Sequence, residues 1–301
     1  MDINSIINRV VWGQCTGDVL GDFLQNKEAP LEIWRSSNIT EQMPFKKGRI
    51  SIFTKQMLLI MDLWKENAHC SSQEFAQLCI EKLHSHTSQT LFCRAIHNKH
   101  PFALPDIEMA ARLIPLAIAI EDLPQMLDLC YDLIKIATID PYASAGILRL
   151  LCYCWGMVHQ HNMDTVLAIL NTWSASKDIP PNIWWAFHQA QFILDNGFGQ
   201  SEMLNFVNSL QNDGNPLQMP STQHSLSVIP LLIHNLHSHN WQNLVFLEGD
   251  FTLLCAIQGA LLAIQQDIPT WLTAPIQHLK VLQKYPIELP KSTQPRQLPL
   301  F

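Results

Sequence analysis

Charged residues are scarce in this sequence: they make up 15% of its 301 residues, while hydrophobic residues make up 48%. This much apolar material allows a large buried core and excludes disorder over most of the chain. The formal net charge is −7, and no basic stripe stands out beyond the short cluster Lys46-Lys47-Gly48-Arg49. Nucleic acids and anionic membranes are bound by a concentrated positive face, so we expect neither as a partner.

Long hydrophobic runs and secretory signals are also missing. The longest apolar stretches, residues 113–120 and 251–264, fall short of the roughly 18 residues that a membrane span needs. The first residues, Met1 to Asn4, do not combine a positive region with an apolar one as a signal peptide would. The eight cysteines lie mostly within apolar helical patterns, which is typical of free buried thiols. These features predict a cytoplasmic protein whose apolar stretches are buried helices.

No convincing run of alternating polar and apolar residues, the mark of a half-buried strand, occurs in the sequence. Apolar residues recur instead at helical spacing, in residues 57–64, 75–83, 122–137, 144–159, 163–174 and 183–194. We therefore predict an all-α protein with a single compact multi-helix domain over residues 1–285. Prolines recur too often after Tyr285 for a regular helix, so residues 286–301 are predicted to form a Pro-rich C-terminal tail.

Two glycine-containing segments at opposite ends of the sequence resemble motifs of a known family. They are Gly13-Gln14-Cys15-Thr16-Gly17-Asp18-Val19-Leu20-Gly21 and Gly249-Asp250-Phe251-Thr252-Leu253-Leu254-Cys255-Ala256-Ile257-Gln258-Gly259-Ala260-Leu261. The first is similar to the opening helix of the ADP-ribosylglycohydrolases, where a Gly-Asp-Ala-Leu-Gly run follows another glycine. The second resembles that family's Gly-Asp-Thr-Asp-Thr-Val-Ala-Ala-Ile-Ala-Gly-Ala-Leu. Residues 268–271 follow it, where the family has Ile-Pro and a Trp.

Three middle segments agree with this family in order and spacing. Residues 48–54 stand where the family has Gly-x-Trp-Thr-Asp-Asp-Thr, and residues 109–116 resemble its Gly-Ala-Ala-Met-Arg-Ile-Ala-Pro-Leu stretch. Residues 137–141 resemble its Thr-His motif, with Ile139 in place of the histidine. The resemblance spans residues 10–275 and implies the helical fold of the dinitrogenase reductase-activating glycohydrolase type.

The resemblance also implies a two-metal site, usually of magnesium or manganese, whose ligands are mainly aspartates of the Thr-Asp-Asp and Asp-x-Asp-Thr motifs. This sequence has Ser51-Ile52-Phe53 at the first motif and Asp250-Phe251-Thr252 at the second, so one of those four aspartates remains. A further family acid falls at Gln25. A single carboxylate cannot balance two divalent ions in a partly dry pocket, so we predict no bound metal and no other cofactor.

The residues left at the matching positions form a predicted remnant pocket, in which no catalytic residue is expected. They are Asp18, Ser51, Thr54, Arg112, Thr138, Asp250 and Thr252. Three of them also have a purely structural interpretation. Asp18 can be a helix cap or an interhelical hydrogen-bonded acid, Asp250 the N-cap of the helix that starts near Phe251, and Arg112 an internal ion-pair partner of one of these acids.

We therefore expect a degenerate member of the family that acts as a non-catalytic binding or regulatory protein. Its partner would be another protein, or an ADP-ribose-like ligand held in the old pocket. One alternative is an altered hydrolase in which Asp18, Asp250 and Glu248 form a metal-free carboxylate site. Another is a structural subunit of a larger assembly, which the low charge and the Pro-rich tail would suit.

Overall fold

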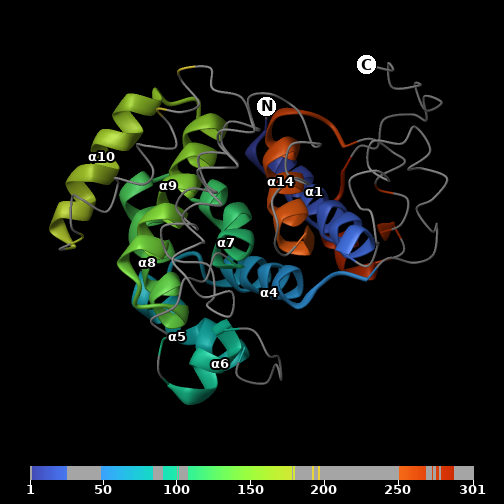
Figure 1. Cartoon of the computed structure of the whole chain (residues 1–301), viewed down its shortest axis with the longest axis horizontal. Helices are drawn as coiled ribbons and strands as arrows, with labels where there is room; N and C mark the ends of the chain where they lie inside the picture. Colours follow the sequence, from blue (N-terminus) through green and yellow to red (C-terminus); the bar gives the residue numbers. More distant parts are fainter. Residues whose placement is uncertain are drawn as a thin grey trace.

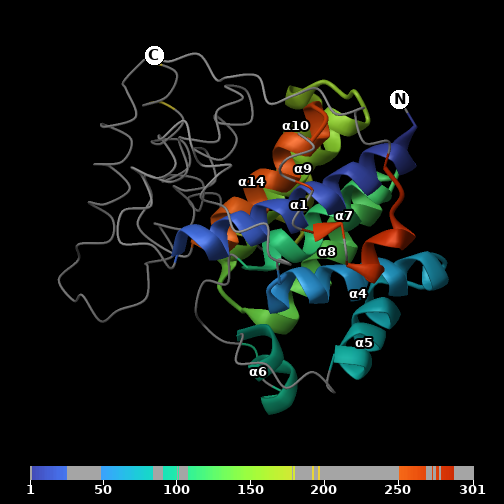
Figure 2. The ribbon, with the colours of Figure 1, turned by 90° about the vertical axis from the view of Figure 1, so that its right-hand side faces the viewer.

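Segments from the two ends of the sequence lie side by side, because α1 (Ile3–Gln25) packs along α14 (Phe251–Gln265) (Figures 1 and 2). The computed structural model describes residues 2–25, 49–83, 91–99, 101, 108–177, 179, 192, 196, 251–268, 273, 276–277 and 279–287. These residues are mostly helical, include no β-strand, and share one hydrophobic core. The prediction of an all-α chain with one compact domain is therefore confirmed for this part.

Three glycines let α1 and α14 approach until their backbones touch. A Cβ added at Gly17 would lie 2.7 Å from the carbonyl carbon of Cys255, and one at Gly259 would lie 2.9 Å from that of Gly13. Both distances are shorter than real Cβ contacts allow. Glycine is normally unfavourable inside a helix, so its role here is to permit this approach. Arg9 adds hydrogen bonds from its guanidinium to carbonyl oxygens near the end of α14.

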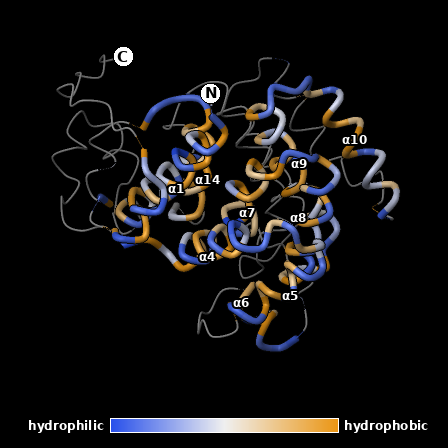
Figure 3. The backbone as a smooth tube through the Cα atoms, turned by 180° about the vertical axis from the view of Figure 1, so that it is seen from behind, coloured by the Kyte–Doolittle hydropathy of each residue, from blue (hydrophilic) through white to orange (hydrophobic). Residues whose placement is uncertain are grey.

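The centre of the described body is α7 (Glu108–Ala119), whose residues from Met109 to Ile118 are all buried. This helix contacts α1, α14 and three others. The neighbours of α7 are α4 (Ile52–Asn67), α8 (Leu123–Ala137) and α9 (Pro141–Val158). Further out lie α5 (Ser72–Leu83), α6 (Leu91–Asn98) and α10 (Met163–Ser176). Apolar positions gather where the helices face one another (Figure 3).

Side-chain caps begin several of these helices where the sequence predicts them. The Ser71 backbone N–H donates to Glu74 at 2.9 Å and the Glu74 N–H to the Ser71 hydroxyl at 3.4 Å, so the predicted capping box is confirmed. Asp122 accepts from the backbone N–H of Gln125 at 2.8 Å at the start of α8. Asn162 accepts from the backbone N–H of Asp164 at the start of α10.

Several predicted helices match the structure closely. Residues 122–137, 144–159 and 163–174 correspond to α8, α9 and α10, with α9 starting earlier because Asp140 caps it through the N–H of Ala143. The apolar stretch 251–264 lies in α14, and the stretch 113–120 ends one residue beyond α7. The predicted helix over residues 183–194 lies outside the described residues, apart from Phe192.

Of the helices described, none is long and apolar enough to cross a membrane. All eight cysteines are free thiols, and seven of them are buried.

A C-terminal segment connects α1 to α4 through hydrogen bonds. It includes the 3-10 helix η4 (Lys280–Lys284) and the fully buried Tyr285. The backbone carbonyl of Tyr285 accepts a hydrogen bond of 2.7 Å from the Trp12 indole N–H. The Tyr285 side-chain hydroxyl donates to the Asp62 carboxylate at 3.1 Å. Lys284 pairs with the same carboxylate at 2.6 Å. Of the tail predicted from residue 286, only residues 286 and 287 are described; the Pro286 carbonyl accepts from Asn8.

Replacing Gly17 by Ala tests the contact between α1 and α14. We expect the free energy of unfolding to fall by about 2 kcal/mol or more, because the new Cβ meets rigid backbone and overpacking outweighs the gain in helix propensity. Urea denaturation followed by circular dichroism measures this change. Gly156→Ala is the control, since its Cβ would meet only the flexible end of Met163, at 2.9 Å, and the Val166 methyl at 3.4 Å. An unchanged stability for Gly17→Ala would contradict the packing described here.

Candidate functional site

Asp18 links α1 to the start of α4. Its side chain is fully buried, and its Oδ2 accepts a hydrogen bond of 2.7 Å from the backbone N–H of Ser51. Ser51 is the N-cap of α4, and its hydroxyl accepts from the backbone N–H of Thr54 at 3.4 Å. The three residues predicted for the first half of the pocket are thus brought together. The structural interpretation of Asp18, an acid that is hydrogen-bonded between helices, is confirmed.

Burial dominates the electrostatics of this carboxylate. Loss of hydration raises the pKa of Asp18 from an ordinary 3.8 to about 7, although the Thr54 hydroxyl and the Ser51 hydrogen bonds pull that pKa down. The nearby charge of Asp22 raises it slightly further. The Thr54 hydroxyl is near enough to act on this charge, but neither it nor Oδ1 of Asp18 has a well-formed hydrogen bond within the described structure. Asp18 is therefore a carboxyl group that gains its proton near neutral pH.

The two positions after Ser51 face the helical body with apolar side chains. Phe53 is 5% exposed and belongs to the hydrophobic core, and Ile52 is half-buried. Neither side chain has an atom that can bind a metal ion. The resemblance places two aspartates of the metal site here, so this half of the site offers Mg²⁺ or Mn²⁺ only the carboxylate of Asp18 and two hydroxyl groups.

Metal-ligating side chains are not clustered elsewhere in the described part of the chain. In that part no three His, Cys, Asp or Glu side chains are placed to hold an ion. His159 and His161 instead stack on Trp155, with ring centroids 4.6 and 4.8 Å apart from the indole. Asp250 lies outside the described residues, so this observation does not extend to it.

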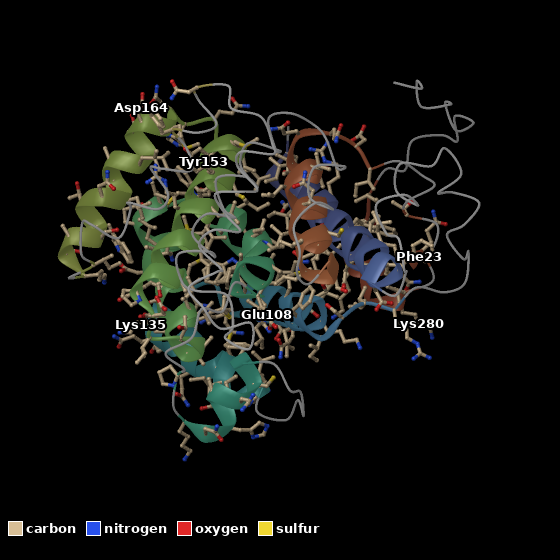
Figure 4. The ribbon with its side chains drawn as sticks, in the orientation of Figure 1. Phe23, Glu108, Lys135, Tyr153, Asp164 and Lys280 are labelled. Carbon is tan, nitrogen blue, oxygen red and sulfur yellow. The ribbon has the colours of Figure 1, made fainter. Side chains whose placement is uncertain are left out.

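Arg112 is held in a separate buried network. Its guanidinium donates to Oε2 of Glu108 and to Oε1 of Gln56, both at 2.7 Å, and it lies 5.1 Å from the centre of the Phe92 ring. Gln56 in turn donates to the Cys93 sulfur at 2.8 Å. Arg112 does form an internal ion pair, with Glu108 on its own helix. The prediction named Asp18 or Asp250 as the partner, and Asp250 lies outside the described residues. Figure 4 marks Glu108 at the start of α7.

The remaining predicted pocket residues are spread over two helix ends. Thr138 is buried at the end of α8, where its hydroxyl accepts from the backbone N–H of Asp140 at 3.0 Å. Its neighbour Ile139, in the position of the family's histidine, is 59% exposed. Thr252 is half-buried in the first turn of α14. Asp250, the predicted N-cap of α14, lies outside the described residues, and α14 begins at Phe251.

Sequence reasoning missed four polar residues of the interior. Glu108 and Arg112 are four residues apart, which is the spacing of a helical ion pair and was a usable signal. Gln56, Gln14 and Gln258 are all fully buried. A glutamine within an apolar helical stretch is the only sign that the sequence offers for such a position.

Comparisons with known proteins give no independent assignment. No protein-family model matches the sequence, and no curated protein matches it either. The family resemblance therefore rests on the motifs described above.

The raised pKa of Asp18 predicts a specific pH dependence of stability. Its folded-state pKa lies above its unfolded value, so Asp18 contributes stability that is full below about pH 4 and is lost as the pH rises through about 7. Asp18→Asn cannot titrate. Its stability relative to the wild type should therefore increase from pH 5 to pH 8, by about 3 kcal/mol at most. Urea titrations of both proteins across this range provide the difference, and a difference that is flat with pH would contradict the assignment.

Loss of the Arg112 guanidinium should be costly because it leaves Glu108 and Gln56 without their shared donor. We expect Arg112→Met to lower the free energy of unfolding by about 3 kcal/mol, and Glu108→Gln/Arg112→Met to lower it by less than the two single changes combined. Chemical denaturation of the four proteins gives this double-mutant cycle. Lys55→Met, an exposed change on α4, is the control for loss of a positive charge. Additive effects in the cycle would argue against a buried pair.

Proposed function

We propose that this chain is a degenerate relative of the ADP-ribosylglycohydrolases that acts in the cytoplasm as a non-catalytic binding or regulatory protein. In this proposal the helical body is retained and the two-metal chemistry is lost. The partner is a protein, or an ADP-ribose-like ligand bound near Asp18, Ser51 and Thr54.

The observation that carries this proposal is the burial of Phe53 beside the Asp18–Ser51 hydrogen bond. An aspartate is expected at position 53 by resemblance, yet the side chain there is part of the apolar core. Two divalent ions carry four positive charges, and they need oxygen ligands with matching negative charge. The Asp18 carboxylate supplies at most one negative charge toward those four positive charges.

An altered hydrolase is the second candidate, and the pKa of Asp18 is the observation that favours it. A carboxyl group that holds a proton near neutral pH can act as a general acid in glycosidic bond cleavage. Against this candidate, Asp18 is fully buried and one of its oxygens is committed to the Ser51 N–H. A general acid must reach the leaving oxygen of its substrate, so the non-catalytic function is the better supported of the two.

Thermal unfolding with and without ligands tests the proposal. A ligand that binds only the folded state raises its stability by mass action, by about 2.7 kcal/mol at a hundredfold excess over Kd. We expect no rise in Tm with Mg²⁺ or Mn²⁺ alone, and any rise with ADP-ribose to be the same in the presence of EDTA. Ser51→Ala is the matched variant, because it removes a hydroxyl beside Asp18 from a partly exposed residue and should reduce an ADP-ribose effect.

The same samples should be incubated with an ADP-ribosylated protein or peptide to assay hydrolysis. The proposal expects no release of ADP-ribose with either metal. A Tm rise that requires metal, or release of ADP-ribose that EDTA abolishes, would contradict the loss of the two-metal site. Release that persists in EDTA and is lost in Asp18→Asn would instead establish the altered hydrolase.

A further inference from the structure

Two aromatic side chains at the end of α9 bind backbone carbonyl groups at the end of α7. The last four carbonyls of a helix have no N–H partner within that helix, so they need donors from elsewhere. The Ile118 carbonyl lies 3.2 Å from Nε2 of His159. The Ile120 carbonyl, just beyond α7, accepts a hydrogen bond of 2.7 Å from the Trp155 indole N–H. Trp155 is buried and His159 is half-buried, so the end of α9 holds the end of α7 in place.

A left-handed turn brings a second histidine onto the same indole. Gln160 has a φ of 56°, and after it the backbone N–H of His161 donates to the Gly156 carbonyl at 2.9 Å. This bond is typical of a Schellman cap, in which the residue after the turn contacts the last turn of the helix. The contact here is His161 on Trp155, with ring centroids 4.8 Å apart and planes 18° apart. His159 stacks on this indole too, at 4.6 Å and 29°.

The contact with Ile118 determines which form of His159 fits this position. A carbonyl oxygen can only accept, so Nε2 carries the proton, and in the neutral ring the free lone pair is on Nδ1. A second proton would therefore put a positive charge on a half-buried ring. Burial lowers the pKa of His159 below its ordinary 6.5, and the charge of His161 lowers it further, although the Ile118 carbonyl and Glu121 act in the opposite direction.

The acids in the turns around this junction lie in solvent. Glu121 and Asp122, between α7 and α8, are exposed, and so is Asp164 in the first turn of α10. Asp122 is also engaged as the N-cap of α8. Asp18, on α1, is the one fully buried acid among the described residues. A charge on His159 is thus compensated mainly through solvent, where attraction between charges is weak.

We propose that Trp155, His159 and His161 form a pH-sensitive clasp, which holds the end of α9 on the end of α7 at neutral pH and loosens in mild acid. A histidine with a lowered folded-state pKa contributes stability that is full above the unfolded value and is lost as the pH falls through the folded value. This direction is opposite to that expected for Asp18. The inference is independent of the proposed function, because no residue of the clasp belongs to the predicted remnant pocket.

Hydrogen exchange of the full chain between pH 5 and pH 8, corrected for the intrinsic exchange rates, tests the clasp. Peptides over residues 156–162 include the amides of His159 and His161, which both donate within the cap. We expect their protection to fall from pH 8 to pH 5, while peptides of α8 change less. His159→Gln keeps an N–H donor near Ile118 but cannot be protonated, so it should remove this loss of protection. His69→Gln, at an exposed histidine after α4, is the control and should retain it.

An equal loss of protection in the wild type and in His159→Gln would overturn the proposal. Nuclear magnetic resonance of the wild type with isotope-labelled histidine provides a test that does not depend on the variant folding. The His159 ring is assigned by its nuclear Overhauser contacts with the Trp155 indole. We expect it to carry its proton on Nε2 at neutral pH and to titrate below 6.5. A midpoint at or above 6.5, or a proton on Nδ1 of the neutral ring, would refute the clasp.

Discussion

Gly13, Gly17 and Gly259 allow the backbones of α1 and α14 to touch, and the other features of the interior follow from this contact. Side chains next to these glycines in the sequence lie in the interior, whether or not they are apolar. Gln14 and Asp18 are buried in this way on α1, and Gln258 on α14. The contact also holds Asp18 against the start of α4, where the Ser51 N–H meets its carboxylate. A local requirement for small residues thus determines where the polar groups of the core lie.

The chemical character of the site depends on how little charge this interior can stabilise. Asp18 is balanced by a backbone N–H and by neighbouring hydroxyl groups, and burial raises its pKa to about 7. Arg112 is the one fully buried arginine among the described residues, and it is compensated by Glu108 and Gln56. The family resemblance would place acids that attract divalent ions at positions 52 and 53, where this chain has Ile52 and Phe53, and Phe53 is part of the core.

Helix positions were largely predictable from the sequence, because periodicity and capping are local. The capping box of Ser71 and the helix that follows Asp122 are examples. The hydrogen bond between Asp18 and Ser51 was predictable only through the family resemblance, because the two residues are far apart in the sequence. The partner of Arg112 was missed although Glu108 stands at helical ion-pair spacing. The unpaired state of Gln14 and Gln258 could not be predicted, because it depends on which face of each helix the glycine contact buries.

Anomalous scattering from crystals grown with Mn²⁺ tests the central claim, that this helical body no longer holds a metal pair, most directly. The account predicts no manganese peak within ligand distance of Asp18 or of the Ser51 hydroxyl, and Phe53 packed in the core as described. Two manganese peaks a few ångströms apart beside these residues would contradict it. They would require ligands that compensate for the lost acids, and the chain would then have to be treated as a metal-dependent enzyme.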